Sequence, residues 1–84
     1  MNIFMAETYE EKQIAPSNKL QRLAFMKGIH SASAFGLALQ KAKITSYGTA
    51  YSKWNGRAEN TQYNVLLAIA KWLGAGSVEE VFDP

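Results

Sequence analysis

The chain has 84 residues, of which 48% are hydrophobic, enough apolar material for one helical domain around a single core. It contains no cysteine, which excludes disulfides and thiolate metal sites. The formal net charge of +2 is spread unevenly: residues 1–16 carry −2, residues 17–76 carry +7 with Glu59 as their one carboxylate, and residues 77–84 carry −3. A basic body between acidic ends indicates a surface that binds a polyanion.

Residues 1–16 show no clean hydrophobic periodicity and end at Pro16, although several of them are large and apolar. We interpret them as an N-terminal arm that is flexible or forms an interface, either with its own domain or with a partner. The arm turns acidic at Glu7, before the apolar region of a signal peptide could develop. The longest apolar run, 65–70, is too short to cross a bilayer. We therefore expect a soluble cytoplasmic protein with no membrane partner.

The first predicted helix begins after Pro16, with Ser17 or Asn18 as its N-cap, and ends at Gly28. Its inward residues are Leu20, Leu23 and Ala24.

A second helix is predicted from a cap at Ser31 or Ser33 to about Lys43. Gly36 inside it costs about 1 kcal/mol relative to alanine. Such a glycine is expected where another helix approaches closely.

The third helix, predicted over about 47–54 with a cap at Thr45 or Ser46, organises the chain. At helical spacing its inward residues are Tyr47, Ala50, Tyr51 and Trp54. The opposite face carries Thr49, Ser52 and Lys53, which are hydrogen-bonding groups and a cation. Gly56 closes the helix in a left-handed conformation.

A fourth helix should begin at a cap on Asn60 or Thr61 and stop at Gly74. The sequence 77–80 (SVEE) is a capping box that opens a final helical turn. Val78, Val81 and Phe82 then close the core. The expected architecture is all-α, with five helices and no strands.

Three segments resemble the lambda-repressor-like (Xre/Cro-type) helix-turn-helix family. Residues 33–39 (SAFGLAL) are similar to the first helix of the motif, where a small residue follows a bulky one. Residues 51–57 (YSKWNGR) resemble the end of the recognition helix. Residues 66–74 with 77–82 are similar to the closing helices, so the likeness covers about 17–82. It implies a compact five-helix helix-turn-helix DNA-binding domain over residues 17–84.

The resemblance implies that the helix around 47–54 enters the major groove of double-stranded DNA. The expected base contacts are Tyr47, Thr49, Ser52 and Lys53. The expected phosphate contacts are Lys41, Lys43, Thr45, Ser46, Asn55 and Arg57. The chain departs from the family between the two helices, where Gln40 replaces the usual turn glycine and residues 40–46 either make a longer connection or lengthen the first helix.

The leading hypothesis is a sequence-specific transcriptional regulator, a Cro-like phage or plasmid repressor that acts as a homodimer on an operator. An antitoxin whose N-terminal arm binds a toxin, and a helical protein-interaction module on the same fold, are the alternatives. His30 is the one histidine, and no nucleophile–base arrangement or phosphate-cradling loop is visible. We therefore expect no enzyme, no cofactor and no metal site.

Overall fold

The computed structural model describes residues 15–83, so the N-terminal arm, apart from Ala15 and Pro16, lies outside the described residues. The described part contains four α-helices and two 3-10 turns. They are α2 (Lys19–Met26), α3 (Ala32–Lys41), α4 (Tyr47–Ser52), η1 (Lys53–Asn55), α5 (Tyr63–Trp72) and η2 (Val78–Glu80). The expectation of a mostly helical domain is confirmed, whereas the fifth expected helix is the single 3-10 turn η2. Within residues 15–83 the extended pairing is confined to one isolated parallel bridge between Arg57 and Asp83.

Side-chain caps fix where three of the helices begin, as the sequence predicts. Asn18 accepts a hydrogen bond from the backbone N–H of Gln21, Ser31 from that of Ala34, and Ser46 from that of Thr49. The predicted cap of α5 is wrong, because its N-cap is Gln62, which makes no side-chain cap bond. The predicted capping box at η2 is wrong, because Ser77 makes no side-chain cap bond and the Glu80 carboxylate accepts instead from the Gly76 N–H and the Ser77 hydroxyl, both at 3.3 Å.

Helices α2, α3 and α5 end in the same turn, in which one residue takes a left-handed conformation. That residue is Gly28 after α2 (φ +81°) and Gly74 after α5 (φ +91°), but Lys43 after α3 (φ +61°). In each case the next N–H bonds back to the carbonyl five residues earlier, as Ile44 does to Leu39 at 2.9 Å. The expectation that Gln40 stands at the turn position is therefore wrong. Helix α3 continues to Lys41, and the connection to α4 is correspondingly short.

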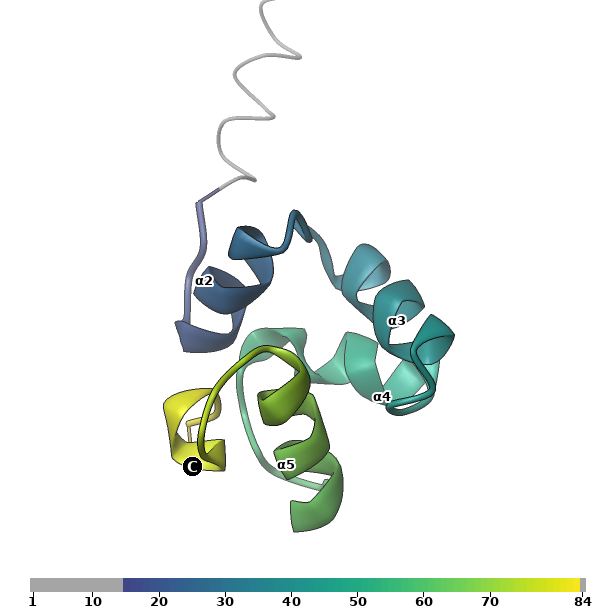
Figure 1. The fold of residues 1–84 in the computed structure, drawn as a ribbon, viewed down its shortest axis with the longest axis vertical. Coiled ribbons are helices and arrows are strands. Elements are labelled where there is room, and N and C mark those ends of the chain that lie inside the picture. The colour runs from purple at the N-terminus through teal and green to yellow at the C-terminus, as the bar shows by residue number, and fades with distance from the viewer. Residues whose placement is uncertain (1–14, 84) are drawn as a thin grey trace, which may run out of the picture.

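The core lies where all the helices meet, and the side chains buried deepest come from every part of the described chain. The largest fully buried side chains are Phe35, Leu20, Leu39, Ile69 and Val81. Figure 1 shows α2 and α3 above, α5 and the C-terminal turn below, and α4 between them. Val78, Val81 and Phe82 are buried, which confirms that the C-terminal turn closes the core. No helix of the described residues has the length and apolarity needed to cross a membrane.

Candidate nucleic-acid interface

Helices α3 and α4 form the closest helix pair of the domain, and Gly36 is the point of contact. A Cβ placed on Gly36 would lie 2.7 Å from Tyr47 Cδ2 and 3.1 Å from the Tyr47 carbonyl oxygen. The expected close approach at this glycine is thus confirmed, and the approaching residue is the first of α4. The contact fixes how α4 sits on α3, and with it which side of α4 faces outward.

The outward side of α4 differs from the one the sequence predicts. Ala50 is fully buried, Lys53 is only 4% exposed, and Tyr51 is 50% exposed. The expectation that Tyr51 packs inward and Lys53 points outward is therefore wrong. The exposed stripe runs through Gly48, Tyr51, Ser52 and Asn55.

Hydroxyl groups gather along this exposed side. The Ser46 hydroxyl donates to Thr49 Oγ1 at 3.0 Å, and the Ser52 hydroxyl donates to the Thr49 carbonyl at 2.7 Å. These bonds leave the Thr49 O–H as a donor and the Ser52 oxygen as an acceptor for a bound molecule. The ring of Tyr51 lies against that of Tyr47, with centroids 5.8 Å apart.

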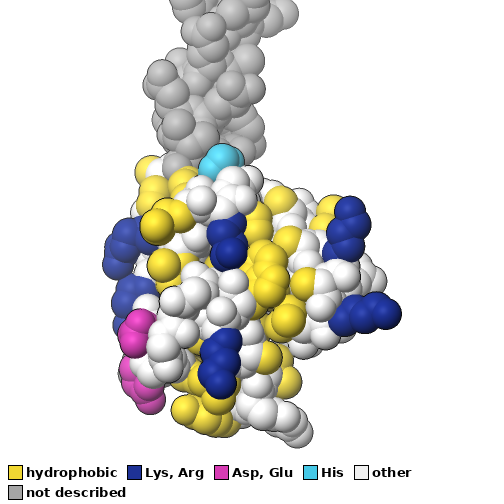
Figure 2. Space-filling model, in the orientation of Figure 1, with side chains coloured by type: hydrophobic (Ala, Val, Ile, Leu, Met, Phe, Trp, Pro, Cys, Tyr) yellow, Lys and Arg dark blue, Asp and Glu magenta, His cyan; other side chains and the backbone are white. Residues whose placement is uncertain are grey.

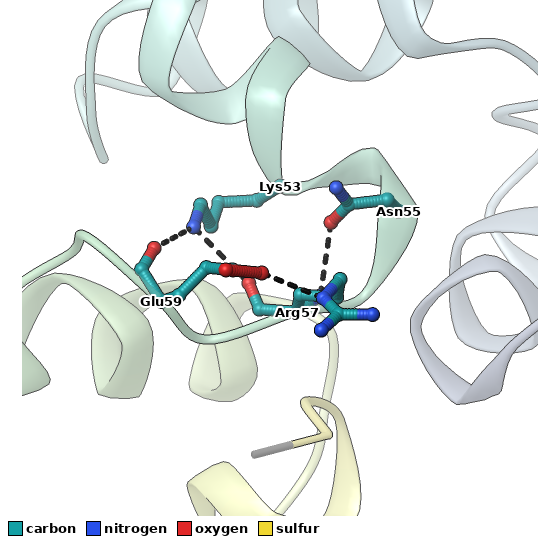
Figure 3. Close-up of polar contacts among 4 residues, drawn as sticks. All are labelled: Lys53, Asn55, Arg57 and Glu59. Atoms are coloured by element: carbon teal, nitrogen blue, oxygen red, sulfur yellow. Dashed lines mark hydrogen bonds and ion pairs between the residues drawn. The ribbon is translucent and has the colours of Figure 1, made fainter.

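Lys53 is held inside the connection that follows η1. Its Nζ donates to the carbonyls of Arg57 at 3.1 Å and Glu59 at 2.6 Å, as Figure 3 shows. The aliphatic stem of lysine can be buried while its head finds polar partners. An ammonium held in this way is not available to a base edge.

Asn55 and Arg57 are joined at the surface just beyond η1. Asn55 Oδ1 accepts from the Arg57 backbone N–H at 3.0 Å, so the Asn55 side chain has its N–H₂ group left as a donor. Arg57 Nε donates to Glu59 Oε1 at 2.6 Å, while its two terminal nitrogens point away from that carboxylate (Figure 3). Both partners of this ion pair are more than half exposed, so it contributes little to stability.

The remaining expected contacts lie in and around the α3–α4 turn. Lys41 is the last residue of α3, Lys43 takes the left-handed turn position, and both side chains are exposed. Thr45 is half-buried and Ser46 is exposed. In Figure 2, basic side chains project from the right-hand edge, over α3 and its turn to α4, and others lie at the left and in the middle of this face, whereas the acidic side chains in this view lie over the C-terminal turn.

The structure thus brings Ser46, Thr49 and Ser52 together, and Asn55 with Arg57, and removes Lys53 from the surface. Tyr51 is the exposed residue of this side that the sequence analysis placed inward. The sequence did hold a signal for the burial of Lys53. The irregular connection after Gly56 has backbone carbonyls that need hydrogen-bond donors, and the first of them, that of Arg57, lies four residues after Lys53.

Comparison of the chain with models of protein families, with curated proteins and with solved structures found no match in any of the three.

Proposed function

We propose that this protein is a sequence-specific double-stranded-DNA-binding transcriptional regulator that reads the major groove with α4. The observation that carries the proposal is the exposed side of α4. It presents hydroxyl and amide groups without a carboxylate, and it is flanked by the exposed cations Lys41, Lys43 and Arg57. Groups of this kind read base edges, and cations beside them hold phosphates.

The proposed base contacts are the exposed Tyr51 and Ser52, with the half-buried Tyr47 and Thr49. The proposed phosphate contacts are Lys41, Lys43, Thr45, Ser46, Asn55 and Arg57. Lys53 is left out because its ammonium is bound to two carbonyls. Phosphate contacts add affinity and salt dependence, while the groups on α4 confer sequence preference.

We also infer that the domain is lambda-repressor-like, with α3 and α4 as its helix-turn-helix. The order of elements, the Gly36–Tyr47 contact and the closing turn at Val78–Phe82 support this fold. A module of this size binds tightly as a homodimer on two half-sites, as a Cro-like repressor in the cytoplasm would.

Selection of duplexes from a random pool by the purified full chain tests the proposal. We expect a palindrome whose half-sites lie one helical turn apart, about 10 base pairs. The affinity for that duplex should fall linearly on a logarithmic scale with salt concentration. Recovery of unrelated sequences, with weak binding that disappears at moderate salt, would contradict sequence-specific recognition.

A helical protein-interaction module is the second candidate, because large apolar side chains are exposed on several elements. Met26 is 82% exposed, Tyr63 61% and Leu37 59%. Surfaces of this kind also occur at protein–protein interfaces. An antitoxin would bind both DNA and a protein partner. Failure of duplex selection together with a stable complex with a protein partner would favour this candidate.

A further inference from the structure

The connection from Gly56 to Glu59 has no regular secondary structure over most of its length, yet its backbone is hydrogen-bonded at every residue. The Gly56 N–H donates to the Lys53 carbonyl at 2.9 Å, and the Arg57 N–H donates to Asn55 Oδ1 at 3.0 Å. The carbonyls of Arg57 and Glu59 both accept from Lys53 Nζ. Irregular backbone is usually mobile, whereas this segment is fixed.

Asp83, near the C-terminus, also forms hydrogen bonds with this connection. The Asp83 N–H donates to the Gly56 carbonyl at 2.7 Å, and the Ala58 N–H donates to the Asp83 carbonyl at 3.0 Å. The start of α2 holds η1, which precedes the connection, because Asn18 and Gln21 both donate to the Trp54 carbonyl. Within residues 15–83, Lys53 is the one side chain that ties Arg57 to Glu59 through their carbonyls.

A buried ammonium bonded only to carbonyls is an unusual choice for a position that faces the core. Lys53 is 4% exposed, and among the described residues it forms no ion pair. Burying a cation without a counter-charge costs free energy that an apolar residue at the same place would not cost. The two hydrogen bonds from Lys53 instead hold the backbone of Arg57 and Glu59 in one conformation.

We propose that Lys53 is a positioning residue of the DNA interface, which sets the Arg57 guanidinium against a phosphate without touching DNA itself. This inference rests on the proposed function. Two bonds from one ammonium fix the carbonyls on either side of Ala58. The backbone that carries Arg57 is therefore held in place, and the Glu59 carboxylate, which accepts from Arg57 Nε at 2.6 Å, leaves the terminal nitrogens of Arg57 pointing away from it (Figure 3). A pre-positioned guanidinium loses less conformational entropy when it binds a phosphate.

The test compares Lys53→Met with Arg57→Ala and with the double variant, all in the full chain. Methionine keeps the length and apolarity of the stem but removes the ammonium. We expect Lys53→Met to lower the salt slope of binding to the selected duplex by about one unit, as Arg57→Ala itself does. The double variant should bind like Lys53→Met alone, because Arg57 is no longer in position.

Hydrogen exchange supplies a readout that does not depend on DNA. In Lys53→Met the Ala58 amide should exchange at least about tenfold faster, while the Ile69 amide in α5 keeps its protection. Lys71→Met is the matched control, because it removes one exposed cation from α5 and should leave the Ala58 amide unchanged. Lys53→Arg is the second variant: it retains a cation whose planar guanidinium presents its donors in a different geometry, and we expect smaller changes in the same direction.

Each of these measurements has an outcome that would overturn the positioning role of Lys53. An unchanged salt slope in Lys53→Met, or additive losses in the double variant, would overturn the positioning role even if the connection opens. Unchanged exchange at Ala58 would show that Lys53 does not hold the backbone. A wild-type chain that binds no duplex overturns the proposed function and this role with it, and the exchange data then judge the connection alone.

Discussion

Lys43 occupies a backbone position that glycine takes at the ends of α2 and α5. An L-residue in the left-handed region carries a steric cost of about 1 kcal/mol that glycine avoids. Lys43 therefore carries this cost in the turn between α3 and α4, where glycine would avoid it. The Lys43 side chain is exposed, so the lysine is not required for packing.

Replacing Lys43 by glycine should therefore stabilise the fold and weaken binding to DNA. We expect the free energy of unfolding in urea to rise by about 1 kcal/mol, while the affinity for the selected duplex falls and its salt slope flattens by about one unit. Gly28→Ala is the control, because the same left-handed conformation should cost it about 1 kcal/mol. A Lys43→Gly variant that is no more stable than the parent would refute the steric argument.

Two glycines on neighbouring helices should respond in opposite ways to alanine. In Gly36→Ala the new methyl group meets the Tyr47 ring and backbone, so we expect a loss of about 1–3 kcal/mol from overpacking. A methyl group on Gly48 would meet no atom within 4 Å beyond its chain neighbours and the backbone of its own helix, so Gly48→Ala should gain up to about 1 kcal/mol of helix propensity. Urea denaturation of both variants measures the difference, and equal effects would contradict the close packing of α4 on α3.

At the scale of elements, the proposed base contacts lie on a side of α4 that is separate from its packing side. Tyr51→Phe removes one hydroxyl from the exposed stripe and keeps the ring. We expect a loss of about 1–3 kcal/mol of binding to the selected duplex and an unchanged melting temperature. Tyr63→Phe, which alters a tyrosine on α5 that is 61% exposed against 50% for Tyr51, is the matched control. Equal losses on selected and random duplexes would exclude Tyr51 from base recognition.

The sequence predicts the ends of helices better than it predicts their orientation. Asn18, Ser31, Ser46, Gly28 and Gly56 act locally, through one side chain or one dihedral angle, and each takes its predicted role. The outward side of α4 depends on contacts between distant segments. The aromatic spacing predicted that Tyr51 faces inward. In the structure Lys53 faces inward instead, because its ammonium binds the carbonyls of Arg57 and Glu59.

The same limit explains the turn between α3 and α4. The family that the chain resembles has a glycine in this turn, and Gln40 occupies the corresponding position in the sequence. Because α3 continues to Lys41, the left-handed conformation falls on Lys43. Residue type alone does not reveal it, since lysine has no preference for that region.

At the scale of the whole molecule, stability depends on the last described residues. Phe82 is 3% exposed, and Phe82→Ala should lower the free energy of unfolding by about 3–5 kcal/mol. That is a large share of the roughly 5–15 kcal/mol typical of a domain. Thermal melting measures the effect, and Met26→Ala, at a residue that is 82% exposed, should change stability by at most about 0.5 kcal/mol. A small effect at Phe82 would mean that the C-terminal turn does not close the core.

The pairing of Asp83 with Gly56 and Ala58 also bears on the order in which the domain forms. Domains emerge from the ribosome N-terminus first, so α2, α3 and α4 are synthesised well before residue 83. Until Asp83 is added, the segment that carries Arg57 lacks two of its backbone hydrogen bonds. The phosphate-binding side of the proposed interface is therefore the last to mature, and a chain interrupted after α5 would have α4 without a finished Arg57 connection.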